Sequence, residues 1–342
     1  MRKICSESAG KIYHLDEVCQ VGAGDSWHEQ PSGIQDVPSV AILLGTYQGK
    51  PFLAEQLESF AAQTYKGWRV WVSDDGSRDG TLEILNTYRM KWGPERLTIL
   101  SGPRKGFGAN FLFMACHSHI LADYYAYSDQ DDIWEADKLA RAVSWLNATP
   151  KHLPALYCSR TLLIDSDGIQ IGPSQLPSKP ATFRNALAQT IAGGNTMVFN
   201  NAARSLLCQA GADVPIFAHD WWTYLAITGC GGYVFYDPRP SLRYRQHGGN
   251  VIGTRISLHN LITRIIKLRE NRYRHFNDTN EMALASLQDK LTPENRSILA
   301  EFSKSRKSSL LPRLLGLWRS GIYRQRWIEN VGLIILAIFR KI

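Results

Sequence analysis

An apolar run at residues 124–127 stops at three carboxylates within four residues, and this feature constrains the fold more than any other. The carboxylates are Asp129, Asp131 and Asp132. Carboxylates this close repel one another, and desolvating any of them without a partner is costly. A hard divalent cation would relieve that cost and could share its remaining coordination with water and phosphates. The alternative is an acidic helix N-terminus that follows a strand, which ordinary capping preferences also favour.

Strands and helices alternate along residues 38–147, as the spacing of the apolar residues indicates. Apolar runs predict strands at residues 40–44, 70–73, 97–100 and 124–127, and helical spacing predicts helices at residues 52–61, 81–90, 106–121 and 137–147. This alternation predicts a mostly parallel, doubly wound α/β sheet flanked by helices. Ligands bind such sheets at the carboxyl ends of the strands. The side chains expected there are Thr46, Asp74, Asp75, Asp129 and Asp131.

The pattern changes after Pro150, but no linker divides the two halves. The second half is predicted to hold strands at residues 156–159, 162–164, 196–199, 232–236 and 242–245, and helices at residues 183–190 and 219–227. We therefore expect one domain over residues 38–255, with halves at 38–150 and 151–255. Residues 1–37 are polar and weakly periodic, which predicts a loosely ordered leader, and residues 256–342 are expected to form a helical, basic C-terminal region.

The positive charge of the chain is concentrated at its C-terminus. The net charge is +8 over 342 residues, and residues 301–342 carry nine Lys/Arg and two Glu, so the rest of the chain is close to neutral. A nucleic-acid-binding protein carries a broad basic surface, so no nucleic acid is expected as a partner. The six cysteines are scattered without a C-x-x-C pair, which favours buried thiols in a reducing compartment.

The basic tail also has helical apolar periodicity. Leu311, Leu315 and Trp318 recur at helical spacing, while Arg319 and Arg326 take other faces. A basic amphipathic helix with aromatic anchors is typical of peripheral binding to an anionic membrane surface. The alternative is a helical cap on the core or an oligomer interface.

Neither a membrane span nor a secretory signal is expected from the sequence. The longest apolar run, residues 331–339, has about half of the roughly 20 residues that span a bilayer. Residues 1–10 lack the apolar core of a signal peptide. We therefore expect a cytoplasmic protein that is peripheral on the inner face of the cytoplasmic membrane.

Seven motifs follow one another over residues 43–250. They are LLGTYQG (43–49), SDDGSRDGT (73–81), GFGANF (106–111), YSDQDDIW (127–134), GGNTMVFN (193–200), HDWW (219–222) and RQHGGN (245–250). Together they resemble the family-2, inverting glycosyltransferases of the GT-A fold, particularly the rhamnosyltransferase-like branch of bacterial surface-polysaccharide assembly. The resemblance covers residues 40–250 and leaves out the leader and the basic tail.

The resemblance implies a site for a nucleotide-sugar donor in the first half, residues 38–150, and an acceptor-binding half at residues 151–255. Asp75 would accept a hydrogen bond from the base, with Asp74 as the second choice, and Gly76 would allow close approach of the backbone. Thr46 and Tyr47 would line the same pocket, Tyr47 by stacking on the base. The motif positions also imply donor contacts for Asn110 and Lys138. An Asp-Gly turn without a ligand is the structural alternative.

The resemblance also implies separate roles for the carboxylates of the acidic motif at residues 127–134. Asp129 would contact the ribose, and Asp131 would bind Mg²⁺ or Mn²⁺, which bridges the diphosphate and stabilises the leaving group. Asp132 would cap a helix or support its neighbours. His247 could complete the metal or diphosphate site or be a satisfied structural histidine. Arg245 could contact a phosphate through its planar fork.

Asp220 is the candidate general base, because transfer to a hydroxyl requires one opposite the leaving group. Burial beside Trp221 and Trp222 would raise the pKa of its carboxyl. The two indole rings would offer flat faces to a sugar acceptor. The alternative is that Asp220 only caps the helix that follows.

The implied reaction moves a sugar, with dTDP-rhamnose as the favoured donor, to a glycan or lipid-linked oligosaccharide acceptor. Two other classes remain open from the sequence. A sugar-nucleotidyltransferase would need a Gly-rich basic loop near the first strand, where only Lys50 follows the turn at residues 45–49. A non-catalytic nucleotide-sugar or glycan-binding protein would not need both Asp131 and Asp220.

Overall fold

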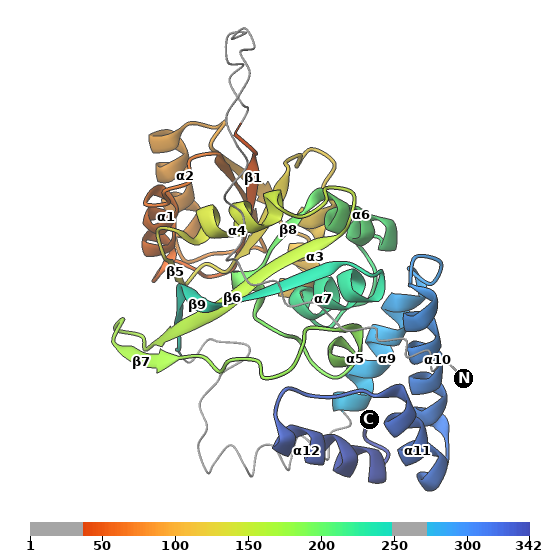
Figure 1. Cartoon of the computed structure of the whole chain (residues 1–342). Helices are drawn as coiled ribbons and strands as arrows, with labels where there is room; N and C mark the ends of the chain where they lie inside the picture. The colour runs from red at the N-terminus through yellow and green to blue at the C-terminus, as the bar shows by residue number, and fades with distance from the viewer. Residues whose placement is uncertain (1–36, 248–271) are drawn as a thin grey trace, which may run out of the picture. The chain divides into compact units, whose positions relative to one another are not determined.

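A nine-stranded sheet runs through the structure, a computed structural model that describes residues 37–247 and 272–342 (Figure 1). The strand order is β3-β2-β1-β4-β8-β6-β9-β5, and β7 pairs with β6 off this path. The strands are β1 (Val40–Thr46), β2 (Trp68–Asp74), β3 (Leu97–Ser101), β4 (Tyr124–Ser128), β5 (Ile133–Trp134), β6 (Ala155–Ile164), β7 (Gln170–Pro173), β8 (Val198–Asn200) and β9 (Tyr233–Arg245).

The first four strands form the parallel part of the sheet that the sequence predicts. In this part Ile42 lies opposite Val70 on one side and Ala126 on the other. The next strand, β8, is antiparallel to both β4 and β6, whereas β6 and β9 are parallel again. The α/β fold class is therefore confirmed, with a mixed sheet beyond β4.

Helices cover both faces of the sheet. They are α1 (Leu53–Ala61), α2 (Thr81–Trp92), α3 (Phe107–Cys116), α4 (Lys138–Asn147), α5 (Phe183–Ala186), α6 (Asn201–Ala210), α7 (His219–Gly229), α9 (Arg272–Ala285), α10 (Pro293–Lys307), α11 (Leu310–Ser320) and α12 (Trp327–Ile338). Alternate residues of β1 point to opposite faces. Ile42 packs in a buried cluster with residues of α1, α2 and α4, and Leu43 packs in a second cluster with residues of α3, α6 and α7.

Several predicted elements differ from the structure. The strands predicted at residues 156–159 and 162–164 are one strand, β6, and the helix predicted at residues 183–190 ends at Ala186. The helix predicted at residues 106–121 ends at Cys116, because His117 is already extended. The strands predicted at residues 232–236 and 242–245 are one strand, β9, which an irregularity opposite Arg160 interrupts. The sequence analysis missed α6, although Asn200 caps it by accepting a hydrogen bond from the Ala203 N–H.

The C-terminal helices pack on the side of the sheet that carries α7. Leu287 and Phe302 are buried in the same cluster as residues of α7, and the Gln325 side chain bonds to Asn185 in α5. In the described part of the chain, no helix is both long and apolar enough to cross a membrane. The predicted leader at residues 1–36, and residues 248–271, lie outside the described residues.

Candidate functional site

A cavity of about 1380 Å³ opens at the carboxyl ends of the parallel strands. Its lining comes from the ends of β1, β2, β3 and β4, from the start of α3, and from β6, β9 and the start of α7. The predicted site residues in this lining are Thr46, Tyr47, Asp75, Gly76, Asn110, Asp129, Asp131 and Asp220. The fold thus brings together side chains that are up to 174 positions apart in the sequence.

Asp74 builds the turn that follows β2. Its Oδ1 accepts a hydrogen bond from the Thr46 hydroxyl at 3.0 Å, and its Oδ2 accepts from the N–H groups of Gly76 and Ser77 at 3.1 and 2.8 Å. Gly76 has a φ of 103°, which a residue with a side chain adopts only with strain. The carboxylate of Asp74 is therefore engaged in shaping the turn, and Asp75 is the one left to face a ligand.

Asp75 fastens the same turn to the loop before α3. Its Oδ1 accepts from the Arg104 N–H at 2.6 Å, and its Oδ2 accepts from the Gly106 N–H at 3.0 Å. A carboxylate has about four lone-pair directions, so each oxygen keeps the capacity to accept a further hydrogen bond. Asp75 can therefore hold the loop and contact a ligand at once.

Asn110 and Gln130 hold neighbouring parts of the rim in place. The Asn110 side chain donates to the Ser73 carbonyl at 2.8 Å and accepts from the Ser73 hydroxyl at 2.5 Å, which fixes α3 against β2. The Gln130 amide accepts from the Tyr47 N–H and donates to the Tyr47 carbonyl, both at 2.8 Å. The Tyr47 ring itself stays 59% exposed in the cavity lining.

Three carboxylates act on one another at the centre of the cavity. Burial raises the pKa of the Asp129 carboxyl to about 7, and the nearby charges of Asp131 and Asp220 add to this effect. Asp129 and Asp131 follow β4, whereas Asp220 comes from the first turn of α7. The fold therefore concentrates negative charge where a cation would be most stabilising.

Asp131 is paired with His247. The two side chains meet at 2.7 Å between Oδ2 and Nε2, and the imidazole ring lies 5.1 Å from the Phe52 ring, centroid to centroid. His247 itself is not among the described residues that line the cavity, but its partner is.

The donor set around Asp131 fits a hard divalent ion. Such an ion is held by one or two carboxylates together with substrate phosphates, and it needs no full cage of protein ligands. Within the described residues, no group of three or more His, Cys, Asp or Glu could hold a metal ion by itself. Asp131, with His247 beside it and Asp129 two positions away, provides the partial set that such a site requires.

Asp132 does not cap a helix, so that part of the prediction is wrong. The helix α4 begins at Lys138, and Asp137 occupies its N-cap position. Asp132 is fully buried, accepts from the Asn195 side chain at 2.6 Å and from the Arg245 N–H at 3.3 Å, and has a pKa raised by burial. Its side chain therefore ties the acidic loop to Asn195 and to the backbone of β9.

Lys138 and Arg245 also lie beneath the acidic loop, outside the described cavity lining. The Lys138 ammonium is fully buried, donates to the Asn195 carbonyl and lies 3.7 Å from the Trp134 ring centroid. The Arg245 guanidinium contacts Glu55 and donates to the carbonyls of Asp131 and Ser166 at 3.2 and 2.9 Å. The predicted donor and phosphate contacts of these two side chains are not supported, because both bond to protein groups and burial lowers the pKa of the Lys138 amine well below its usual value.

Asp220 lies in the first turn of α7 and lines the cavity. Burial raises the pKa of its carboxyl to about 6, while hydrogen bonds from the N–H groups of Trp221, Asp220 and Gly194 partly oppose this rise. The Trp221 N–H lies 2.7 Å from Oδ1. Asp220 thus satisfies N–H groups at the start of α7 and also has the raised pKa expected of a general base.

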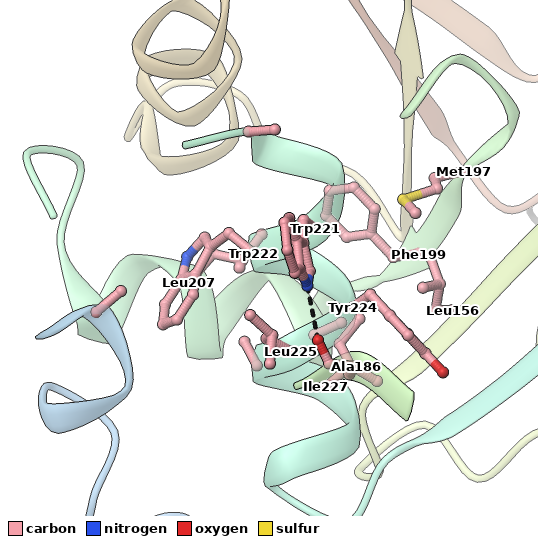
Figure 2. Packing of buried hydrophobic residues seen from close by; sticks show 14 of the residues in the cluster. Leu156, Ala186, Met197, Phe199, Leu207, Trp221, Trp222, Tyr224, Leu225 and Ile227 are labelled. Carbon is pink, nitrogen blue, oxygen red and sulfur yellow. Dashed lines mark hydrogen bonds between the residues drawn. The ribbon is translucent and has the colours of Figure 1, made fainter. Parts of the chain in front are cut away.

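Trp221 and Trp222 do not face the cavity, and the prediction that they contact an acceptor is wrong. The whole of α7 is buried, so its rings pack into the core (Figure 2). The Trp221 indole N–H donates to the Ala186 carbonyl at 2.6 Å, and Trp222 is fully buried. Sequence reasoning treated the two rings as a surface because they follow a candidate catalytic residue, but the helix that carries them is covered on all sides.

His219 is a cavity residue that the sequence analysis did not single out. Its ring stacks on Phe111 at 3.9 Å between centroids, and neither ring nitrogen has a hydrogen-bond partner within the described residues. Burial lowers the pKa of the imidazole to about 3, so it is neutral at physiological pH. Its place directly before Asp220 in the HDWW motif was the available signal.

Comparison with known sequences identifies the class of enzyme. The sequence profile of Glycosyl transferase family 2 matches residues 41–196. Over 243 residues the chain is 29% identical to the dTDP-rhamnosyl transferase RfbG of Shigella flexneri, an alignment that covers 68% of this chain and 81% of that protein. Over 170 residues it is 31% identical to the putative glycosyltransferase EpsE of Bacillus subtilis (strain 168), which covers 49% of this chain and 59% of that protein.

The fold is similar to that of a solved structure as well. S. aureus TarS, residues 1–349, solved in complex with UDP-GlcNAc, superposes with a TM-score of 0.53 at 16% identity, covering 88% of this chain and 81% of that one. At this identity the likeness concerns the fold, and it agrees with a GT-A type of architecture. Residues 41–196 therefore form a glycosyl transferase family 2 domain, and the chain is a glycosyltransferase.

Proposed function

We propose that this enzyme is a metal-dependent, inverting glycosyltransferase of bacterial surface-polysaccharide synthesis. It transfers a sugar, with rhamnose from dTDP-rhamnose as the best candidate, to a glycan or lipid-linked oligosaccharide. The observation that carries the proposal is the convergence of Asp129, Asp131 and Asp220 in one cavity, from two elements that lie about 90 residues apart. The similarity to RfbG supports the choice of donor.

The donor would lie across the ends of the parallel strands. Asp75 would accept the N3–H of the thymine through a lone pair that its two backbone contacts leave available. The exposed ring of Tyr47 is placed to stack on the base. Asp129 would accept hydrogen bonds from the ribose hydroxyls, and Thr46 and Gly76 complete this end of the lining.

Asp131 and His247 would hold Mg²⁺ or Mn²⁺ together with the diphosphate of the donor. The ion would neutralise the charge that develops on the leaving diphosphate. His247 orients Asp131 through their 2.7 Å contact, and Arg245 holds the Asp131 carbonyl from below. The protein thus holds the side chain of Asp131 through His247 and its backbone through Arg245.

Asp220 would take the proton of the acceptor hydroxyl as that oxygen attacks the anomeric carbon. The oxygen–carbon bond forms on the face opposite the leaving diphosphate, which inverts the configuration. A carboxyl with a pKa of about 6 is mostly ionised at neutral pH, yet it is more basic than an ordinary aspartate. The hydrogen bonds from the start of α7 hold it in place.

We further propose that α11 and α12 dock on an anionic membrane surface, where lipid-linked acceptors would be found. Trp318, Trp327 and Leu311 are 77%, 77% and 78% exposed. The exposed residues of α12 recur at helical spacing: Trp327, Val331, Ile334 and Ile338. Six Lys/Arg against one Glu in residues 310–342 provide the complementary charge for anionic headgroups. This location corresponds to the inner face of the cytoplasmic membrane.

A panel of nucleotide sugars tests the catalytic proposal. The purified chain should release the nucleoside diphosphate from one donor, with dTDP-rhamnose expected, only when Mg²⁺ or Mn²⁺ is present. Asp131→Asn should abolish this release, whereas Asp289→Asn, at an exposed position outside the lining, should not change it. Full activity in the presence of a chelator, or of the Asp131→Asn variant, would contradict the proposal that Asp131 binds a catalytic metal ion.

A further inference from the structure

Two cysteines that are distant in the sequence lie against each other outside the cavity. Cys116 is the last residue of α3, and Cys208 lies near the end of α6. Their thiols are hydrogen-bonded to each other, and the Cys208 Sγ lies 3.7 Å from the Ala115 carbonyl oxygen. Both side chains are half-buried, and neither is part of the cavity lining. The proposed reaction therefore gives this pair of thiols no role.

Arg204 places a positive charge beside the two thiols. It precedes Cys208 by one helical turn, so both side chains lie on the same face of α6. Its guanidinium donates from Nε to the Ala115 carbonyl and from Nη2 to the His117 carbonyl, both at 2.8 Å. These two carbonyls flank Cys116 in the chain. The contacts of Arg204 therefore hold the end of α3 and the end of α6 together where the thiols meet.

The surroundings favour the thiolate of Cys208 over that of Cys116. The hydrogen bond from Cys116 lowers the pKa of the Cys208 thiol to about 6, and the charge of Arg204 adds to this effect against the opposing effect of burial. The same hydrogen bond and burial raise the pKa of Cys116. The phenols of Tyr125 and Tyr127 on β4 also face the pair, and both are neutral because burial raises their pKa. At neutral pH one sulfur is thus a nucleophile and the other a protonated thiol.

The other two described cysteines differ from Cys208. Cys158 is fully buried, and burial raises the pKa of its thiol. Cys230 is half-buried like Cys208, but burial raises the pKa of its thiol to about 11. A reactive cysteine combines a lowered pKa with access from solvent, and a second thiol beside it can convert its oxidised form to a disulfide. Among the cysteines that the structure describes, Cys208 alone has these features.

We propose that Cys116 and Cys208 form a redox-responsive pair, which hydroperoxides convert to an intramolecular disulfide. The Cys208 thiolate attacks the O–O bond of the peroxide. A sulfenic acid forms, and the alkoxide or hydroxide that leaves takes up the proton released by the thiol. The Cys116 thiol then attacks the sulfenic sulfur, the S–S bond forms and water leaves. The two thiols lose two electrons to the peroxide. In a reducing compartment this disulfide is transient, since dithiols reduce it again.

This modification site is separate from the cavity but is connected to it by α3. The helix begins at Phe107, which lines the cavity, and it ends at Cys116. A disulfide would therefore tie to α6 the same helix whose Asn110 is bonded to Ser73 beside the donor pocket. The assignment does not rest on the proposed glycosyl transfer.

Peptide mapping of the full chain by mass spectrometry, after treatment with hydrogen peroxide, tests the proposal. The wild type and the control variant Cys230→Ser should each yield a linked pair of peptides that contain Cys116 and Cys208, and dithiothreitol should separate them. Cys116→Ala cannot form the disulfide, so dimedone should trap a sulfenic acid at Cys208. Cys208→Ala should give no such adduct at Cys116. At pH 7, iodoacetamide should alkylate Cys208 of the wild type about tenfold or more faster than Cys230.

Three results would overturn the assignment. The first is that Cys116 and Cys208 both remain thiols after peroxide treatment, or form disulfides with Cys5 or Cys19 instead of with each other. The second is alkylation of Cys208 with the pH midpoint of an ordinary thiol, about 8.5. The third is that Cys116→Ala leaves this midpoint unchanged instead of raising it. None of these measurements needs turnover, so their failure leaves the proposed reaction untouched.

Discussion

Replacing Asp220 by asparagine distinguishes two roles of this residue: that of a general base, and that of a hydrogen-bond acceptor at the start of α7. The amide oxygen of asparagine can still accept the hydrogen bond from the Trp221 N–H that Asp220 accepts at 2.7 Å, so the start of α7 should be preserved. What is lost is the capacity to take a proton. General-base catalysis contributes roughly 10²–10⁴-fold, and we expect a loss of kcat in this range with little change in the KM of the donor.

The pH dependence of the reaction rate gives a second, independent test of Asp220 as the base. A base must be ionised to act, so its contribution falls as the pH drops through its pKa. With a pKa of about 6, the ionised fraction falls by about tenfold between pH 7 and pH 5. An aspartate at its ordinary value of 3.8 would remain mostly ionised over the same interval.

The assay is metal-dependent hydrolysis of the nucleotide sugar, in which water takes the place of the acceptor. The wild-type kcat/KM should show an acid limb near pH 6, and the residual activity of Asp220→Asn should lack it. Because the charge of Asp220 adds to the raised pKa of Asp129, any limb that Asp129 contributes should remain in the variant but move to lower pH, whereas the limb of Asp220 should disappear. The reasoning is refuted if the variant keeps its rate within about tenfold, or if the donor KM rises while kcat is unchanged.

Two further predictions concern tryptophan residues of α7, α11 and α12. Trp318→Ser with Trp327→Ser should weaken binding to vesicles that contain phosphatidylglycerol by at least about tenfold, because both rings are exposed on a basic surface; Met90→Ser, 80% exposed on α2, is the control. Unchanged vesicle binding, or a dimer that the double variant dissociates, would contradict membrane docking. Trp222→Ala should lower the free energy of unfolding by about 3–5 kcal/mol in a denaturant titration, whereas Trp318→Ala should change it by less than about 0.5 kcal/mol. An equal effect of the two would show that Trp222 is not a core residue.

Substitution is a sharper test of the tail than deletion. Leu336, Ala337 and Ile342 are buried in the same cluster as residues of α7, and the Arg313 guanidinium donates to the Ala337 carbonyl at 2.8 Å. Removing residues 308–342 would therefore uncover the core as well as remove the proposed docking surface. The alternatives left open by the sequence are not exclusive, because α11 and α12 cover the core with one face and expose apolar residues on the other.

Local patterns in the sequence were sufficient to predict the parallel half of the fold. The runs around Ile42 and Ala126 are buried on both faces, so each forms a continuous apolar segment. The run around Val70 is buried on one face and partly exposed on the other. The acidic residues after these strands converge because parallel strands end at one edge of the sheet. The second half was harder to predict, since β8 is only three residues long and reverses the direction of the sheet.

The individual roles within the site depended on contacts that no local pattern reveals. Asp74 and Asp75 are adjacent in the sequence and both line the cavity, yet Asp74 shapes the turn after β2 and Asp75 holds the loop before α3. Lys138 and Arg245 carry charges that suggest phosphate binding, but their partners, such as Asn195 and Glu55, come from distant segments. Tyr236 and Tyr244 of β9 line the cavity, but nothing in the sequence of this strand indicates which of its residues reach it.

Gln130 has a consequence for how substrate preference can evolve. Its side chain forms two hydrogen bonds with the backbone of Tyr47. The turn next to the proposed base pocket and the loop that carries Asp131 are therefore rigidly connected. A shift that widens the pocket for a different base must also move the acidic loop. By thermodynamic reciprocity, whatever the nucleotide does to the metal affinity the metal does to the nucleotide affinity. Base selection and cation preference in this enzyme are therefore expected to change together.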